Sequence, residues 1–409
     1  MRAASASGIE SSQGGPRAPE NGALSGEASA PPTPEAPAGP APARWVKVWD
    51  LPTRVFHWML VFLVAVNAVT GLLTPEWWMG AHTWAGYGLV ALMIFRLVWG
   101  VCGSEYSRVV SFIYPPRDTF EHLRGLLLLR PPHYVGHNPT GALMVFALTG
   151  VLIALVVTGL LVLGGEEKQG PLSAVIGYSL GSAAKQAHHW LTILLLVMVA
   201  GHIAGVLTES VLTHDNLVRA ITTGWKKLPP AAPVPTPRAA RPVLAAALLV
   251  VAAGAAVATL DWFSSRPPPF SLRTLPENPT YKKECGACHY AFNPSLLPAA
   301  SWAGLMTGLH EHFGEDASLD GATIRSLMVW LVSNAAETFD TESANRFRIV
   351  SPDDPYRVSS TPYWVRKHAG ISPDVFLRKS VRSKVNCHAC HRDAETGRYD
   401  DQAIAIPEE

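Results

Sequence analysis

The stretch His188-His189-Trp-Leu-Thr-Ile-Leu-Leu-Leu-Val-Met-Val-Ala-Gly-His202 decides the fold. It belongs to an apolar run over about residues 187–208, close to the roughly 20 residues that a helix needs to cross a bilayer. His188 and His202 are 14 residues apart, close to four full turns. They therefore share one helix face and lie about 21 Å apart along the axis. His189 lies about 140° from that face, which makes it the worse partner for His202.

Similar apolar runs occur elsewhere in the chain. The other four cover about residues 55–73, 81–101, 142–163 and 243–260. Tryptophans stand near the ends of the runs, where aromatic belts are expected, at Trp77, Trp78, Trp99 and Trp225. Hydrophobic residues make up 48% of the chain and charged residues only 16%, which is typical of a protein with membrane spans. The sequence predicts five transmembrane helices in a lipid bilayer.

Basic residues predict the orientation of these helices. Twelve of them lie before the first run, after the second and after the fourth: Arg44, Lys47, Arg54, Arg108, Arg117, Arg124, Arg130, Arg219, Lys226, Lys227, Arg238 and Arg241. The loop between the first and second runs and the loop between the third and fourth contain, as basic residues, only Lys168 and Lys185. The positive-inside rule then places the N-terminus in the cytoplasm and the region after the fifth helix outside it. We expect a multi-pass protein of the bacterial inner membrane with a periplasmic C-terminal domain.

Composition divides the chain into four parts. Residues 1–43, rich in Ala, Pro, Gly and Ser, are predicted to be disordered and contain no apolar core of a signal peptide. A membrane domain is predicted over 44–228, a linker with the fifth helix over 229–269, and a soluble domain over 270–409. Helices are expected in the soluble domain at 301–313, with Gly314 as its stop signal, and at 323–336, with Asp320 or Ser318 as its cap. The net charge of +1 gives no indication of nucleic-acid binding.

Two pentapeptides use four of the five cysteines. They are Cys285-Gly-Ala-Cys288-His289 and Cys387-His-Ala-Cys390-His391. This spacing is the attachment signature of c-type haem, in which two thiols bind the porphyrin and the adjacent His reaches the iron. A pair of zinc sites or a redox dithiol is the alternative, but zinc needs four converging ligands rather than a fixed His after each pair. The sequence thus predicts two covalent c haems, and Cys102 is left as a packing residue.

The histidines in the apolar runs predict non-covalent haem b, which needs two axial imidazoles. Ionisable residues within membrane spans are uncommon and usually functional. His57 and His202 lie toward the cytoplasmic side, whereas His82 and His188 begin their spans on the outer side. The economical arrangement is therefore two b haems, one held by His57 and His202 and the other by His82 and His188.

Other polar residues receive simpler interpretations. Arg54 and Arg96 lie near the cytoplasmic side, where either guanidinium could bind a haem propionate. Arg54 could equally be only a positive-inside residue. The loop histidines are expected to face solvent: His122, His133, His137 and His214.

Several segments together resemble a known family. They are Val48-Trp-Asp-Leu-Pro-Thr-Arg-Val-Phe-His57-Trp, His82-Thr-Trp-Ala-Gly-Tyr-Gly, Gly136-His-Asn-Pro-Thr-Gly and Gly201-His-Ile-Ala-Gly-Val-Leu. Over about residues 45–228 the chain resembles the bacterial cytochrome b(561) and nickel–iron hydrogenase b-type cytochrome family. The resemblance implies a four-helix di-haem bundle, with its ligand pattern on His57, His82, His188 and His202. The chain departs from the pattern at His189 and Trp190, so His188 and His189 both remain candidate ligands.

Residues 279–409 resemble a di-haem cytochrome c domain that is often fused to that module. The matching segments are Glu284-Cys-Gly-Ala-Cys-His289, Ser301-Trp, His312-Phe-Gly-Glu-Asp-Ala-Ser-Leu, Ser333-Asn-Ala-Ala-Glu, Lys367-His368 and Asn386-Cys-His-Ala-Cys-His391. The family's haems have two His ligands each, and the resemblance implies His312 and His368 as the distal ligands. His310 is two residues from His312, about 200° round a helix, so both cannot face one haem. His310 and His388 are expected to be solvated or outside the ligand set.

The fold expected is mainly α: a transmembrane four-helix di-haem b bundle, a fifth membrane helix and a small, mostly helical di-haem c domain. The function expected is electron transfer from membrane quinol to a periplasmic cytochrome or haem protein, resembling a quinol:cytochrome c oxidoreductase. A membrane subunit of a multisubunit enzyme such as a nickel–iron hydrogenase is the alternative, and a haem-based sensor is a third. The sequence leaves a homodimer open.

Overall fold

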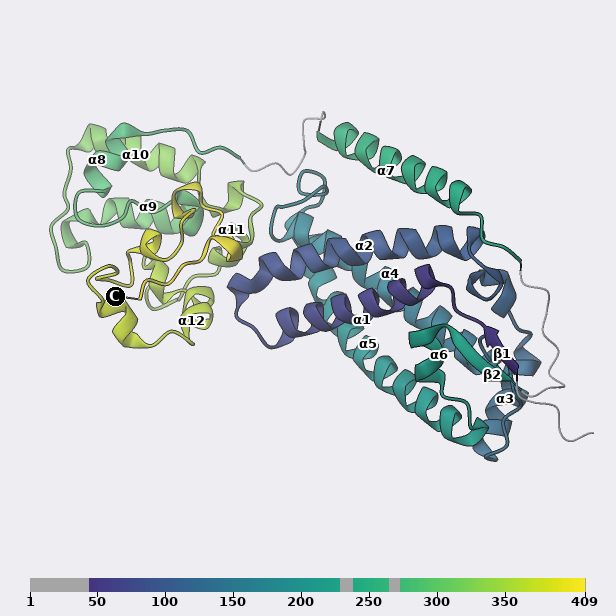
Figure 1. The fold of residues 1–409 in the computed structure, drawn as a ribbon. Helices are drawn as coiled ribbons and strands as arrows, with labels where there is room; N and C mark the ends of the chain where they lie inside the picture. The colour runs from purple at the N-terminus through teal and green to yellow at the C-terminus, as the bar shows by residue number, and fades with distance from the viewer. Residues whose placement is uncertain (1–43, 229–237, 265–272, 409) are drawn as a thin grey trace, which may run out of the picture. The chain divides into compact units, whose positions relative to one another are not determined.

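The computed structural model describes residues 44–228, 238–264 and 273–408. The disorder predicted for 1–43 and most of the two Pro-rich linker segments lie outside the described residues. Helices dominate the described part of the chain, and the mainly α prediction is confirmed (Figure 1).

Five helices are long and apolar enough to cross a membrane, as predicted. They cover Leu51–Leu72, Glu76–Cys102, Pro139–Gly165, Tyr178–Thr213 and Pro242–Thr259. The fourth begins at Tyr178, well before the predicted start at residue 187, because the less apolar segment 178–187 continues the same helix. His188 therefore lies about three turns into its helix rather than at its beginning. Hydropathy identified the apolar part of this helix but not the residue at which the helix begins.

Four helices form the membrane bundle: α1 (Leu51–Leu72), α2 (Met79–Cys102), α4 (Pro139–Gly165) and α5 (Tyr178–Thr213) (Figure 1). α1 packs along α2, α4 packs along α5, and α2 also contacts α4. Apolar side chains from three of these helices form a common core at Met93, Leu152, Leu155 and Leu195. The four helices thus surround one interior, into which side chains from different spans can converge.

The fifth spanning helix, α7 (Pro242–Ser264), packs against α2. Trp99, Cys102 and Ala245 form a buried cluster where the two helices meet. Cys102 is 1% exposed, which confirms that it is a packing residue.

Small elements that the sequence did not predict close one end of the bundle. Strand β1 (Arg44–Lys47) pairs antiparallel with β2 (Trp225–Leu228), with Arg44 opposite Leu228. Helices α3 (Pro116–Leu127) and α6 (Leu217–Thr223) lie in the loops after α2 and α5. The side chain of Asp50 accepts a hydrogen bond from the backbone N–H of Thr53 (2.8 Å) and so caps α1. This two-stranded sheet joins the segment before α1 to the segment after α6.

The C-terminal part contains five short helices joined by loops and 3₁₀ turns: α8 (Pro279–Cys285), α9 (Ala299–Thr307), α10 (Gly321–Ser333), α11 (Glu342–Phe347) and α12 (Pro362–His368). α9 packs on α10, and their apolar faces place Trp302, Met306, Leu327 and Leu331 in one buried core. Asp320 caps α10 by accepting bonds from the N–H groups of Ala322 and Thr323, as one of the two predicted caps.

The predicted helix over 301–313 is wrong at its C-terminal end. α9 ends at Thr307, and Leu309–Glu311 forms a 3₁₀ turn. Gly308, rather than Gly314, follows the last helical residue. His310 and His312 therefore do not lie on one α-helix, so the expected 200° between them on a helix does not describe their arrangement.

Candidate functional site

Three pairs of histidine rings face one another at nearly the same spacing. The ring centroids are 6.2 Å apart for His82 and His188, 6.1 Å for His289 and His312, and 6.1 Å for His368 and His391. Two imidazoles that bind one metal ion, each with its nitrogen about 2 Å from the metal, have centroids about 6 Å apart. Each pair therefore fits the two axial ligands of a haem iron.

The His82–His188 pair joins α2 and α5, and a threonine orients each ring. Nδ1 of His82 lies 3.2 Å from the hydroxyl of Thr70 on α1, and Nδ1 of His188 lies 3.0 Å from the hydroxyl of Thr158 on α4. Both hydroxyls donate their own proton to a backbone carbonyl one turn earlier. They must therefore accept from Nδ1–H, which leaves each Nε2 with a free lone pair, as a metal ligand requires.

Sequence reasoning missed these threonines, although a signal was present. The pentapeptide Val-Thr-Gly-Leu-Leu occurs twice, at residues 69–73 and 157–161. Its glycine also borders the site in both copies: a Cβ at Gly71 would lie 3.0 Å from Cε1 of His82, and one at Gly159 would lie 3.3 Å from Cε1 of His188. The repeat thus supplies the same two contacts to each half of the pair.

His57 on α1 and His202 on α5 lie close enough to interact electrostatically. They do not form a close ring pair among the described residues, and Nδ1 of His57 is buried without a hydrogen-bond partner. A Cβ added at Gly205, one turn after His202, would meet no atom within 4 Å, so there is room beside this pair. After the predicted orientation, we call His57 and His202 the inner pair and His82 and His188 the outer pair. The inner pair has its candidate ligands near each other but lacks the fixed geometry of the outer pair.

The two candidate propionate partners differ in their contacts. Nη1 of Arg96 donates to the carbonyl oxygen of Ser107 (3.0 Å), and its guanidinium lies 5.8 Å from the ring centroid of Phe112. Nε of Arg54 is buried without a partner. An orphaned donor of this kind fits a site completed by an anionic group.

Two loop histidines that were predicted to face solvent do not, and that prediction is wrong for them. His122 is 1% exposed, and its Nδ1 lies 2.8 Å from the hydroxyl of Thr140. His137 lies between Trp49 and Phe112, with ring centroids 4.7 Å and 4.5 Å away. The loops fold back onto the bundle, which hydropathy does not reveal. His133 and His214 are exposed, as predicted.

His289 and His312, in the C-terminal part, have nearly parallel rings, with an angle of 16° between their planes. Nδ1 of His289 lies 2.8 Å from the carbonyl oxygen of Tyr290 and must donate to it, so Nε2 is free to bind a metal. Cys285 ends α8, and Cys288 is exposed in the following turn. Burial, with His289 nearby, lowers the pKa of His312 and favours the neutral imidazole that metals bind.

His368 and His391 form the fourth candidate site. Nδ1 of His368 donates to the carbonyl oxygen of Trp364 (2.9 Å) at the end of α12. Burial, with His368 and Lys367 nearby, lowers the pKa of His391 to about 4. Buried polar atoms without partners lie at the second pentapeptide, on Nδ1 of His391 and Oδ1 of Asp393. Such a group of orphans fits a site that a polar cofactor edge completes.

The histidines that compete with these candidates point elsewhere. His189 is exposed and its ring contacts Trp190, while His310 and His388 are exposed. No group of three or more His, Cys, Asp or Glu side chains among the residues described is arranged to hold a metal ion. The geometry is that of paired axial imidazoles, which can support electron transfer when the iron has no open position.

Family comparisons match the two parts of the chain separately. Residues 48–224 match the family model of prokaryotic cytochrome b561, and residues 281–399 match that of dihaem cytochrome c. A probable Ni/Fe-hydrogenase 1 B-type cytochrome subunit from Escherichia coli is 26% identical, covering 44% of this chain and 89% of the relative. A probable Ni/Fe-hydrogenase B-type cytochrome subunit from Azotobacter vinelandii is also 26% identical, covering 44% and 88%.

Solved structures resemble the C-terminal part. The diheme cytochrome c from Rhodobacter sphaeroides is 43% identical, covering 31% of this chain and 99% of its own, with a TM-score of 0.27. The diheme cytochrome type c from Shewanella baltica is 31% identical, covering 32% and 95%, also with a TM-score of 0.27.

Proposed function

We propose that this protein transfers electrons from membrane quinol to a periplasmic cytochrome or haem protein. The chain belongs to the prokaryotic cytochrome b561 family over residues 48–224 and to the dihaem cytochrome c family over residues 281–399. Both families bind haem, of the b type and the c type respectively. Transmembrane electron transfer follows from the two families and the five apolar helices. The quinol donor, the periplasmic acceptor and the topology belong to the proposal.

The observation that carries the proposal is the spacing of about 6 Å in three histidine pairs. Bound haems would supply one-electron redox centres, and an iron with imidazoles on both faces has no position open for a substrate. The proposal assigns His57, His82, His188 and His202 to two b haems, and His289, His312, His368 and His391 to two c haems. Cys285, Cys288, Cys387 and Cys390 would attach the c haems.

The residues of the chain perform the tasks that this function needs. The threonines hold the outer pair in one tautomer, and the proposal assigns Arg54 and Arg96 to the haem propionates on the inner side. The bundle keeps the two b-type pairs at different depths, since His188 and His202 lie about 21 Å apart along α5. The distribution of basic residues supports a position of the inner pair near the cytoplasm and an inner-membrane protein with a periplasmic C-terminal domain.

A membrane subunit of a hydrogenase is the second candidate, because the relatives carry that description. These relatives cover 44% of the chain and leave the C-terminal part unmatched. The fused c-type domain gives the chain a redox partner of its own, which disfavours dependence on a separate enzyme subunit.

Haem content and quinol reduction together test the proposal. We expect pyridine haemochrome analysis of the purified protein to give equal amounts of b-type and c-type haem. Quinol as the sole reductant should then reduce both types in the absorbance spectrum, in an anaerobic sample. A b-to-c ratio far from one would overturn the haem count, and c haems that stay oxidised while the b haems are reduced would overturn the pathway.

A further inference from the structure

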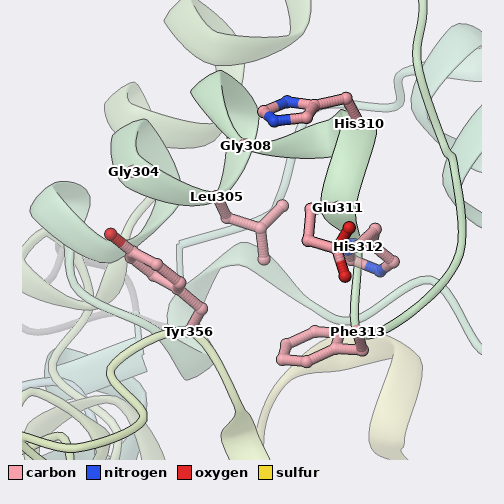
Figure 2. Close-up of a pocket in the computed structure, with 8 residues that line it drawn as sticks. All are labelled: Gly304, Leu305, Gly308, His310, Glu311, His312, Phe313 and Tyr356. Carbon is pink, nitrogen blue, oxygen red and sulfur yellow. The ribbon is translucent and has the colours of Figure 1, made fainter.

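A surface hollow adjoins the pair formed by His289 and His312. It has a volume of about 170 Å³ and is lined in part by Leu305, Glu311, His312, Phe313 and Tyr356. Figure 2 shows Glu311, His312 and Phe313 following one another along one side, with Leu305 and Tyr356 opposite. Small-molecule sites usually measure about 300–1,000 Å³, so this hollow suits a protruding side chain of another protein better than a small ligand.

The segment beside the hollow turns sharply and presents an aromatic ring. His312 and Glu315 pair through their backbones, with N–H···O distances of 2.8 Å and 3.2 Å. Phe313 and Gly314 form the two-residue loop, with φ of 54° and 95°. This is the type I′ pattern, in which positive φ at both positions favours Asn-Gly. A bulky residue in left-handed backbone is strained, and such strain tends to persist where a residue has a task.

Phe313 connects the candidate iron ligand with the surface. Its ring centroid lies 4.9 Å from that of His312, and the residue is 47% exposed. Tyr356, across the hollow, is 41% exposed. Exposed aromatic residues beside a shallow hollow are common anchors of protein interfaces.

The chain segment that forms one side of the hollow is acidic. Residues 304–324 contain four carboxylates and no Lys or Arg. All four are exposed: Glu311, Glu315, Asp316 and Asp320. Arg357 lies over the ring of Phe313 (4.2 Å), but Nε of Arg357 is paired with Asp354 at 2.7 Å. Charge complementarity therefore favours a basic partner at this surface.

We propose that the hollow around Phe313, with its acidic rim, is the docking surface for a soluble redox protein whose exposed haem edge is ringed by lysines. The proposal rests on the proposed function and names the place where electrons leave the chain. One electron passes from the c-type domain to one ferric acceptor, and no bond or proton is transferred. The acidic rim raises the rate of encounter, and the aromatic anchors fix the short-lived complex.

Stopped-flow reduction of the basic mitochondrial cytochrome c by the full-length, quinol-reduced protein tests the docking surface. We expect the Glu311→Gln/Glu315→Gln double variant to lower the second-order rate constant by about tenfold at low ionic strength. High salt should remove most of this difference, because it screens exposed charges. The matched control is Glu277→Gln/Glu395→Gln, which removes two exposed carboxylates of the same domain that do not line the hollow.

A second variant tests the aromatic anchor without disturbing the turn. Phe313→Asn supplies a residue that suits positive φ, so the loop should keep its shape. We expect a severalfold lower rate constant at every salt concentration, with the c haems still fully reduced by quinol before the acceptor is added.

The outcomes separate the two proposals. Equal rates for the Glu311→Gln/Glu315→Gln variant and its matched control would overturn the docking surface, provided that quinol still reduces the c haems. Failure of quinol to reduce the c haems before any acceptor is added would instead overturn the proposed function.

Discussion

The two histidine pairs of the membrane bundle differ in how completely the protein alone arranges them. In the outer pair, His82 and His188 face one another at 6.2 Å, and a threonine hydroxyl accepts from each Nδ1. In the inner pair, His57 and His202 interact only electrostatically, and Nδ1 of His57 has no partner. The same bundle thus contains one preformed ligand pair and one that needs a further group to complete it.

The difference follows from the helices that border each pair. The outer pair lies beside two copies of Val-Thr-Gly-Leu-Leu, which place a hydroxyl and a glycine against each ring. Near the inner pair, Arg54 precedes His57 by one turn of α1, and its buried Nε has no partner, which suits an anion. We infer that polar neighbours orient the outer ligands, whereas the haem and its propionates organise the inner site when they bind.

The largest expected effect is the loss of the outer b haem when His188 is replaced. His188→Ala removes the ring that faces His82, so half of the b-type haem should be lost while the c-type haem stays constant. His189→Ala should retain all haem, because His189 is exposed and contacts Trp190. Pyridine haemochrome analysis of both purified variants measures the result. If the two variants exchange phenotypes, the face of α5 described above is not the one that binds haem.

A smaller effect is expected at the threonines. Thr158→Val removes the acceptor for Nδ1 of His188, and loss of such an outer-shell partner typically weakens binding about tenfold or more. Thr158→Ser keeps the hydroxyl and should behave like the native protein. Thr70→Val should weaken binding in the same way, because Nδ1 of His82 lies 3.2 Å from that hydroxyl.

The rate at which b-type haem passes to a haem-scavenging protein measures this effect. Equal rates for the Val and Ser variants of Thr158 would show that the hydroxyl does not orient His188, and the outer site would then be no better organised than the inner one.

The contacts of these threonines could not be predicted from the sequence, whereas the helices of the membrane part could. Residue type and spacing were enough to predict the five helices and to propose His82 and His188 as a ligand pair. The hydroxyl contacts depend on α1 packing against α2 and α4 against α5, and those pairings are tertiary facts. The repeated pentapeptide was visible, but without the packing its threonine had no assigned partner.

In the C-terminal part, the pentapeptides and the resemblance selected histidines that the structure brings together in pairs. The local conformation around His312 was not predictable, because Leu305, Met306 and Leu309 continue an apolar pattern past the end of α9. Phe313 has a positive φ, which bulky residues rarely adopt, so its conformation could not be predicted from local preference. That residue is the centre of the proposed docking surface.

The glycines of the repeat offer a test of close approach. A methyl group at Gly71 would lie 3.0 Å from His82, whereas one at Gly150, on α4, would meet no atom within 4 Å. Gly→Ala in a helix gains up to about 1 kcal/mol, but overpacking costs about 1–3 kcal/mol. Gly150→Ala should therefore stabilise the protein slightly, and Gly71→Ala should be neutral or destabilising. Thermal unfolding, followed through the b-type Soret band, measures both. A gain in Gly71→Ala equal to that in Gly150→Ala would mean that the outer site is looser than described.

The smallest expected effect concerns the charge beside the inner pair. Arg54→Gln removes a positive charge that favours the reduced, less positive iron, so the midpoint potential of the inner b haem should fall. An interaction of about 1 kcal/mol, reasonable for a half-buried charge, corresponds to a shift of ~40 mV for one electron. Arg124→Gln, which removes an exposed charge from α3, is the matched control and should leave the potential unchanged. Redox titration of the purified protein resolves the two b haems. A shift of the outer haem in place of the inner one would reverse the assignment of Arg54, and with it the view that charge organises the inner site.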